Sequence, residues 1–298
     1  MYLLPMGFNY WAYVALDWSV DNFEIKRAVT FGRQVIHIHD YDIGGFELVQ
    51  RGLDRFISAG KTPYADELYA GAKGITLDSL DYSPYENASI IADLRNPPEY
   101  NPMVIERQNS YDAVFDIGTS EHVGNPYTSL QNAFSLLRPG GFYFYDLPYT
   151  GWLDHGLFQF NPAFFADFCR VNSYLMKYQF IHQTARGEQL FFCRNSTGLN
   201  MGNVILSIFG CIQKPPAPQS IMAAPAQDLN RMTLHDIKHS IDSEDILLAN
   251  TPVFNPVKPN EFIEYLNGNR DFPLVCVEGG IGHLVANKNI FSPSIAYA

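Results

Sequence analysis

Basic residues are scarce in this chain. It has 20 Lys and Arg against 31 Asp and Glu, which gives a formal net charge of −11. Proteins that bind a nucleic-acid backbone need clustered Lys and Arg, so this composition excludes nucleic acid as the main partner. An acidic surface remains compatible with small neutral or cationic molecules.

Cysteines are also few, and they are not clustered. They are Cys169, Cys193, Cys211 and Cys276. No pair shows CxxC or zinc-site spacing, so we expect buried free thiols in a reducing compartment.

Long apolar runs and dinucleotide glycine loops are absent. No apolar run reaches the roughly 18 residues of a spanning helix, and the apolar N-terminus lacks the basic residues of a signal peptide. We therefore expect a soluble cytoplasmic protein with no membrane contact. No GxGxxG follows any expected strand, which argues against a nicotinamide-binding fold.

What the sequence does contain is an alternation of strand and helix patterns. The chain is 298 residues long and 47% apolar, enough for one large α/β domain with an appendage. Strands are expected at 34–39, 75–80, 89–92, 113–117 and 142–147. Helices are expected at 19–30, 46–57, 125–137 and 162–170, and 62–73 is a further helix or a loop insertion. Such alternation predicts a doubly wound α/β fold, whose mostly parallel sheet is covered on both faces.

Later segments close the sheet and then change character. Strands at 174–181 and 204–212, with a short piece at 189–194, form a strand pair that closes an otherwise parallel sheet of seven strands. From Lys214 the sequence KPPAPQSIMAAPAQ has the composition of a linker. We therefore divide the chain into an α/β domain at 1–214, a linker at 215–228 and a C-terminal accessory segment at 229–298. Within that segment, 232–248 is expected to be helical.

Acidic residues end four of the expected strands: Asp40, Asp81, Asp93 and Asp116. Ligands of doubly wound sheets lie outside the carboxyl ends of the strands. A carboxylate at the end of the second strand can accept hydrogen bonds from both ribose hydroxyls, and one after the third can accept from an adenine amino group. The four together indicate a ligand that contains adenosine.

Three segments carry a resemblance to a known family. The run YDAVFDIGTSEHVGNP, continued by SLQNAFSLLRPGGFYFYDLP, resembles the fourth and fifth motifs of class I S-adenosylmethionine-dependent methyltransferases. SLDYSPYENASIIADLRNP and GWLDHGLFQFNPAFFADF are similar to segments of a subgroup in that family. The match spans about 74–172. It implies a Rossmann-like fold, S-adenosyl-L-methionine as cofactor and methyl transfer to a small molecule or saccharide.

The resemblance implies a cofactor site at the strand ends. The expected cofactor-binding residues are Asp40, Gly44, Asp81, Asp93, Leu94, Asp116, Gly118 and Thr119. The sequence departs from the family at the loop after the first expected strand. That loop reads HIHDYDIGGF, with Gly44 and Gly45 displaced and no GxGxG. A catalytically inactive member of the family, which no longer turns over the cofactor, is therefore kept as an alternative.

Methyl transfer to a hydroxyl calls for positioning and for removal of a proton. His155 is the first candidate for the general base, because the loop after the fifth strand would overhang the methyl group. His122 is the second, although it could instead brace the adjoining helix. Asp146, Tyr149 and Phe158 are expected to contact the substrate.

Two histidine pairs have spacings compatible with zinc. They are His37 with His39 on a strand, and His235 with His239 on a helix. Neither pair has an evident third ligand nearby, so no metal site is predicted. The functional prediction is thus an O-methyltransferase, and the alternative is a binding or regulatory protein of the same fold. Homodimerisation is left open.

Overall fold

A computed structural model describes residues 7–8, 10–36, 64–67, 73–183, 190–191, 205–217, 273–278 and 281–286. The predicted helices at 46–57 and 232–248 lie outside these residues, as does nearly all of the predicted linker. The proposed division at 214 and 228 therefore stays a prediction. None of the helices among the described residues is long and apolar enough to cross a bilayer.

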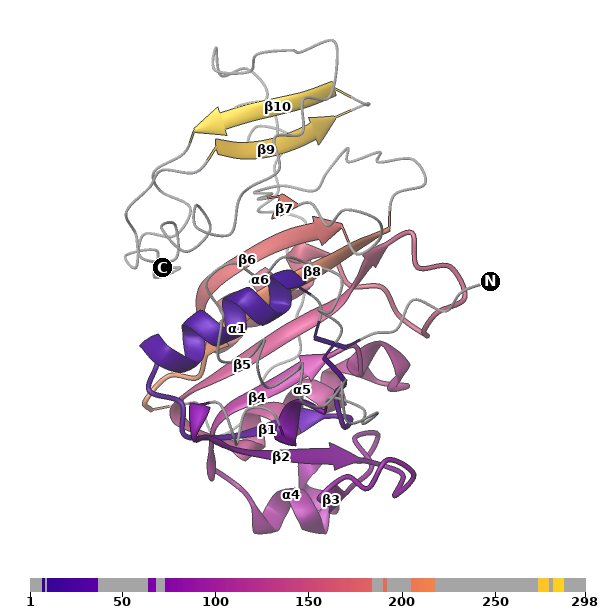
Figure 1. Cartoon of the computed structure of the whole chain (residues 1–298), viewed down its shortest axis with the longest axis vertical. Coiled ribbons are helices and arrows are strands. Elements are labelled where there is room, and N and C mark those ends of the chain that lie inside the picture. Colours follow the sequence, from indigo (N-terminus) through magenta and orange to yellow (C-terminus); the bar gives the residue numbers. More distant parts are fainter. Residues whose placement is uncertain are drawn as a thin grey trace, which may run out of the picture.

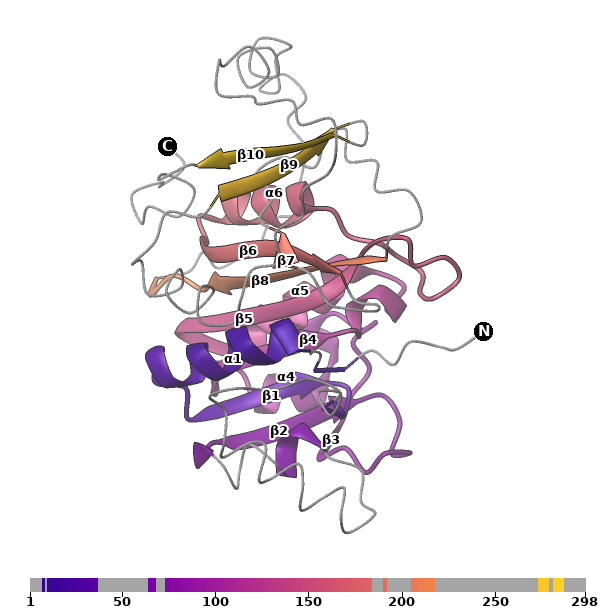
Figure 2. The ribbon, with the colours of Figure 1, turned by 45° about the horizontal axis from the view of Figure 1, so that its top comes forward.

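An eight-stranded sheet dominates the described part of the chain. Its strands are β1 (Arg27–Phe31), β2 (Thr76–Asp81), β3 (Ile90–Ile91), β4 (Tyr111–Ile117), β5 (Leu137–Thr150), β6 (Leu175–Gln183), β7 (Leu190–Phe191) and β8 (Leu206–Gln213). They lie in the order β3-β2-β1-β4-β5-β8-β6-β7. The stack of strands in Figures 1 and 2 follows this order from β2 to β6.

Strand directions divide the sheet into two parts. The strands from β3 to β5 are parallel to their neighbours, and their order 3-2-1-4-5 is that of a doubly wound sheet. β8 is antiparallel to both β5 and β6, and β7 is antiparallel to β6. The prediction of a mostly parallel sheet with a closing strand pair is confirmed, and the two-residue β7 lies beyond that pair.

Helices cover both faces of the sheet. They are α1 (Tyr10–Asn22), η1 (Pro98–Tyr100), α4 (Pro102–Glu106), η2 (Ser120–His122), α5 (Pro126–Leu136) and α6 (Pro162–Asn172). α1 lies in front of the sheet in Figure 1, and α5 and α6 lie behind it.

Alternate side chains of β5 form the contacts on these two faces. Phe142 stacks on Phe23, just beyond α1, with ring centroids 4.4 Å apart. On the other face Tyr145 stacks on Phe165 of α6 at 3.7 Å. β4 is almost wholly buried, as a central strand between two helical layers must be. These aromatic contacts hold the parallel strands at fixed positions, and so fix where their carboxyl ends meet.

The N-terminal prediction was wrong in position. The helix occupies Tyr10–Asn22 rather than 19–30, and Arg27–Phe31 is the first strand, between β2 and β4. The chain turns at Glu24, whose φ is 51°, a left-handed value that an α-helix cannot continue through. Within the predicted strand at 34–39, Val35 and Ile36 form only isolated bridges, and 37–39 lie outside the described residues.

The predicted helix or loop insertion at 62–73 lies largely outside the described residues, and nine other predicted elements of the α/β domain are confirmed with shifted ends. They correspond to β2, β3, β4, β5, β6, β7, β8, α5 and α6. In the C-terminal segment the structure describes one antiparallel hairpin, β9 (Pro273–Glu278) with β10 (Ile281–Ala286).

Candidate active site

A cavity of about 670 Å³ opens at the carboxyl ends of the parallel strands. Its walls come from the ends of β1 to β4 and the segments that follow them, at Gly32–Val35, Leu80–Tyr82 with Glu86, Ala92–Arg95, and Gly118, Thr119, His122 and Val123. The loops after β1 and β4 face each other where the strand order reverses, which is where doubly wound sheets bind their ligands. The volume lies within the range of small-molecule sites.

Gly32 is the first residue after β1. Its φ is +71°, and a Cβ built on it would lie 3.0 Å from Nε2 of Gln34 and 3.2 Å from Oγ1 of Thr119. Both the backbone conformation and the space therefore favour glycine. The glycine loop expected at 39–45 is at Gly32 instead, because the first strand ends at Phe31. Asp40 and Gly44 lie outside the described residues, so their predicted role stays untested.

The loops after β1 and β4 are joined by hydrogen bonds. Thr119 donates its hydroxyl to the Phe31 carbonyl at 2.8 Å, and Gln34 donates its amide to the same oxygen at 2.7 Å. Gly118, with φ +74°, donates its amide to the Asp146 carbonyl at 2.9 Å. Gly118 and Thr119 thus line the cavity opposite Gly32, where a ligand would contact main-chain atoms.

Asp81, at the end of β2, and Asp93, after β3, both line the cavity as predicted. Asp81 accepts a hydrogen bond from the Ser83 amide at 2.9 Å, and its Oδ2 faces the loop after β1, 3.9 Å from the position of a Cβ on Gly32. Asp93 is bound in a bidentate manner by Arg95, at 2.9 Å from Nε and 2.6 Å from an η nitrogen. Those hydrogen bonds lower the pKa of Asp93 below its usual value.

Arg33 holds the outer wall of the cavity and was not predicted. It pairs with Asp66 at 3.1 Å and with Glu67 at 2.9 Å, and it donates to the Glu86 carbonyl at 2.8 Å. Its guanidinium also lies 4.1 Å from the centroid of the Tyr64 ring. One side chain therefore connects three segments of the chain, and only a knowledge of where β1 ends could have indicated it.

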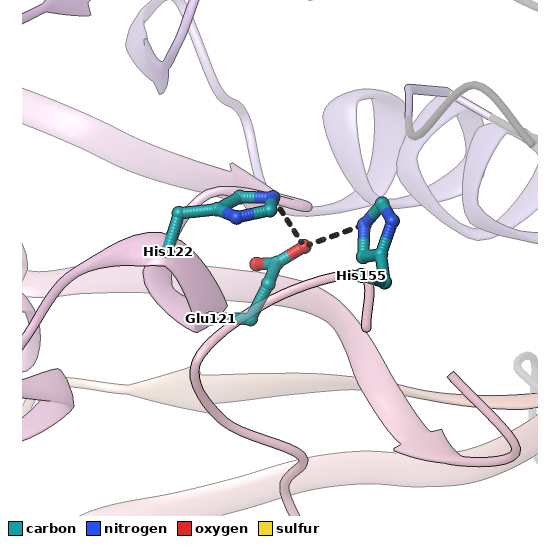
Figure 3. Close-up of side chains that lie close together, drawn as sticks. All are labelled: Glu121, His122 and His155. Atoms are coloured by element: carbon teal, nitrogen blue, oxygen red, sulfur yellow. Dashed lines mark ion pairs between the residues drawn. The ribbon is translucent and has the colours of Figure 1, made fainter. Parts of the chain in front are cut away.

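A carboxylate and two imidazoles gather beside the cavity (Figure 3). Glu121 and His122 belong to η2, and His155 comes from the loop after β5. Oε1 of Glu121 lies 3.6 Å from Nε2 of His122 and 3.7 Å from Nε2 of His155. His122 lines the cavity itself, so the two predicted catalytic histidines are brought together at its edge.

Glu121 is the member of this cluster that the sequence prediction missed. Its side chain is 0% exposed, and neither carboxylate oxygen has a hydrogen-bond partner among the residues that the structure describes. Burial raises the pKa of the Glu121 carboxyl above its usual value. The signal was the EHV motif, in which the glutamate directly precedes the histidine that was predicted.

The loop that carries His155 is attached to Glu121 through main-chain atoms. The amides of Leu157 and Phe158 donate to the Glu121 carbonyl at 2.8 and 3.1 Å. A Cβ on Gly156 would lie 2.8 Å from Cγ of Glu121, so this close approach requires glycine. Trp152 packs against the His155 ring at 4.7 Å. The His155 ring is thus held in place.

Two predicted site residues, Asp116 and Asp146, are fully buried in this structure. Asp116 is fully buried and accepts hydrogen bonds from the Ser120 hydroxyl, from the Ser120 amide at 3.1 Å and from the Tyr143 hydroxyl at 2.7 Å. It braces the turn into η2, and burial raises its pKa. Asp146 is also fully buried, 2.8 Å from Nε2 of His182. Neither lines the cavity, because each side chain is enclosed by the residues that it contacts.

The remaining predicted residues divide between the cavity and the core. Leu94 lines the cavity. Tyr149 is partly buried against the hydrophobic core, and Phe158 is 37% exposed in the anchored loop. Neither of these two lines the cavity, and their predicted contact with substrate stays a prediction.

No protein-family model matches the sequence, and no curated protein matches it. Several solved structures resemble the chain at low identity. The MccD protein is 10% identical, with a TM-score of 0.39 over 68% of this chain and 96% of its own. The 1,6-didemethyltoxoflavin-N1-methyltransferase of Burkholderia thailandensis, solved with S-adenosylhomocysteine, is 12% identical, with a TM-score of 0.34 over 68% and 76%.

A SAM-dependent methyltransferase from Archaeoglobus fulgidus is 10% identical, with a TM-score of 0.35 over 67% of this chain and 94% of its own. At TM-scores this low, these likenesses carry no argument about activity. The fold assignment rests on strand order and direction. The chain has the Rossmann-like methyltransferase fold.

Proposed function

We propose that this chain is an S-adenosyl-L-methionine-dependent methyltransferase that methylates an oxygen of a small molecule or saccharide. One observation carries the proposal. A cavity lies at the carboxyl ends of β1 to β4, with glycine at the close approach after β1 and a carboxylate at the end of β2. That arrangement suits an adenosine-containing ligand.

The lining residues fit the parts of this cofactor. Asp81 would accept hydrogen bonds from the ribose hydroxyls, and Asp93 from the adenine amino group, while Leu94 offers an apolar surface to the base. Gly32, Gly118 and Thr119 would line the methionine part. Asp40 and Gly44 keep the role that the sequence predicts for them.

The cofactor supplies a methyl group on a sulfonium, so the protein has mainly to position the acceptor in line with it. A hydroxyl acceptor must also lose a proton. His122, on the cavity wall, and His155, beside it, are proposed to promote that loss. Tyr149 and Phe158 are proposed to border the acceptor.

The alternative, a silent protein of this fold, was based on a glycine-poor loop after the first strand. Gly32 follows that strand, so this basis no longer holds. Loss of turnover would instead have to arise elsewhere in the cavity. The experiment below also decides between the two functions.

Calorimetric titration with S-adenosylmethionine and S-adenosylhomocysteine tests the proposal. We expect each to bind with one site per chain. Asp81→Asn should weaken binding by at least about tenfold, because a hydrogen bond to a charged group contributes about 1.5–3 kcal/mol. Absence of heat at high micromolar ligand would reject the enzyme. Binding without methyl transfer to any hydroxyl acceptor in a broad panel would favour the silent protein.

A further inference from the structure

Glu121 is a buried carboxylate whose oxygens make no hydrogen bond within the described part of the chain. Its side chain is 0% exposed, and the two nearest imidazole nitrogens lie 3.6 and 3.7 Å from Oε1, beyond hydrogen-bond distance. An isolated ionised carboxylate is costly to bury, and buried charges in proteins are normally paired or coordinate a metal. A cation held among Glu121 and the two neighbouring imidazoles would compensate this charge.

The surrounding atoms are potential metal ligands. One oxygen of Glu121 and one ring nitrogen each of His122 and His155 lie within 4.8 Å of one another. Nε2 of His155 is likewise buried without a hydrogen-bond partner. Bonds of about 2.0–2.2 Å to one ion would place such atoms roughly 3–3.5 Å apart, so small side-chain rotations complete the site.

The scaffold holds two of these residues close together before any ion binds. The amides of Leu157 and Phe158 attach the loop of His155 to the Glu121 carbonyl. His122 is 48% exposed and lines the cavity, so the side of the cluster facing the cavity is open. Catalytic metal sites have this form, with three protein ligands and one open position.

We propose that Glu121, His122 and His155 bind one divalent first-row transition-metal ion, with an open coordination position toward the cavity. Imidazole and carboxylate together suit zinc and ferrous iron better than magnesium or calcium, which prefer oxygen ligands. The sequence prediction of no metal site considered only the two histidine pairs and not this combination.

The role of the ion rests on the proposed function. An acceptor hydroxyl bound at the open position would release its proton more easily to water in the cavity, because a metal ion lowers the pKa of a bound hydroxyl. His122 and His155 would then promote proton loss through the ion, and neither would accept the proton itself. Metal binding as such does not depend on methyl transfer.

Titration of the full chain, stripped of metal by chelation, tests the site directly. We expect one Zn²⁺ per chain by calorimetry, and visible absorption bands of Co²⁺ bound to nitrogen and oxygen ligands. Glu121→Gln and His122→Ala should each weaken binding by about 100-fold or more, since even outer partners of metal ligands contribute 10–100-fold. His122 is half-exposed, so its replacement should leave the fold intact, and circular dichroism checks this.

A control variant replaces His235 and His239 by alanine together and should bind the ion unchanged. Equal affinity of the wild type, Glu121→Gln and His122→Ala would overturn the proposal, as would loss of binding in the control variant or no Co²⁺ spectrum at all. Binding of S-adenosylhomocysteine without metal binding would reject this site alone, leaving His155 as the base. Metal binding without S-adenosylhomocysteine binding would reject only the proposed methyltransferase function.

Discussion

Gly32 governs the shape of the cavity at the scale of single residues. Its left-handed backbone places the loop after β1 against Gln34 and Thr119, and a side chain at this position would have to displace them. Gly74 provides a natural comparison. It has a similar φ of +65°, but a Cβ on it would meet nothing within 4 Å.

Gly32→Ala and Gly74→Ala should therefore differ in ligand binding more than in stability. Each should lower the free energy of unfolding by about 1–2 kcal/mol, the cost of a left-handed conformation for a residue with a Cβ. Under the proposed function, Gly32→Ala alone should also weaken S-adenosylhomocysteine binding by about tenfold or more. Urea denaturation and calorimetry measure the two effects, and equal affinity of both variants would contradict this role of Gly32.

Sequence reasoning found some of these residues and missed others for identifiable reasons. Asp81, Asp93 and His122 were found because each follows a strand whose pattern is clear. Gly32 was missed because a helix was predicted at 19–30, which covers most of β1 and displaced the first expected strand. Asp116 also ends a strand but is fully buried, and its predicted contact with the cofactor stays a prediction. The sequence carries no sign of which strand-end carboxylates are buried.

At the scale of elements, helices were predicted correctly where particular residue types mark the start of the helix. Asn125 and Asn161 each precede a proline, and in the structure each caps a helix by accepting a hydrogen bond at 3.1 Å, from the Tyr127 and Phe164 amides respectively. β1 offered no such mark. A strand buried on both faces shows no alternation, and the turn at Glu24 has no glycine or proline to signal it.

The two caps should contribute similarly to stability. Asn125→Ala and Asn161→Ala should each lower the free energy of unfolding by about 1 kcal/mol, because an amide at the helix start loses its partner. Asn125→Asp and Asn161→Asp keep an accepting oxygen and should change little. Urea denaturation of the four variants measures this, and an alanine variant as stable as its aspartate counterpart would show that the cap contributes nothing.

For the whole molecule, the sheet buries phenols and thiols together with one lysine. Burial raises the pKa of Tyr143, Tyr145, Tyr178, Cys169 and Cys211. Burial lowers the pKa of Lys214 to about 8, although its ammonium donates to the carbonyls of Phe134 and Leu137 at 2.7 and 2.6 Å. As the pH rises, the phenols and thiols therefore lower the free energy of unfolding, and Lys214 raises it.

We expect stability to fall above about pH 9. In the unfolded chain thiols lose protons near pH 8.5 and phenols near pH 10, whereas the folded chain keeps them, so their stabilisation is present below these values and lost above them. Each group contributes up to about 1.4 kcal/mol per pH unit. Lys214 acts in the opposite sense between about pH 8 and 10.4, where it is one group against two thiols below about pH 10 and against all five groups above it.

Urea denaturation at a series of alkaline pH values measures this loss. Tyr178→Phe, which removes one buried phenol, should make the fall less steep above about pH 10. A free energy of unfolding that stays constant up to about pH 10.5 would show that these groups titrate alike in both states.

The anchoring of the loop after β5 has a consequence for how this protein can diversify. Its position depends on amides and on Gly156, while the side chains of Leu153 and Leu157 are 81% and 68% exposed. Replacing those side chains leaves the anchoring bonds to Glu121 in place. Selection, in nature or in a variant library, can therefore alter the surface next to the cluster without disturbing the cluster itself.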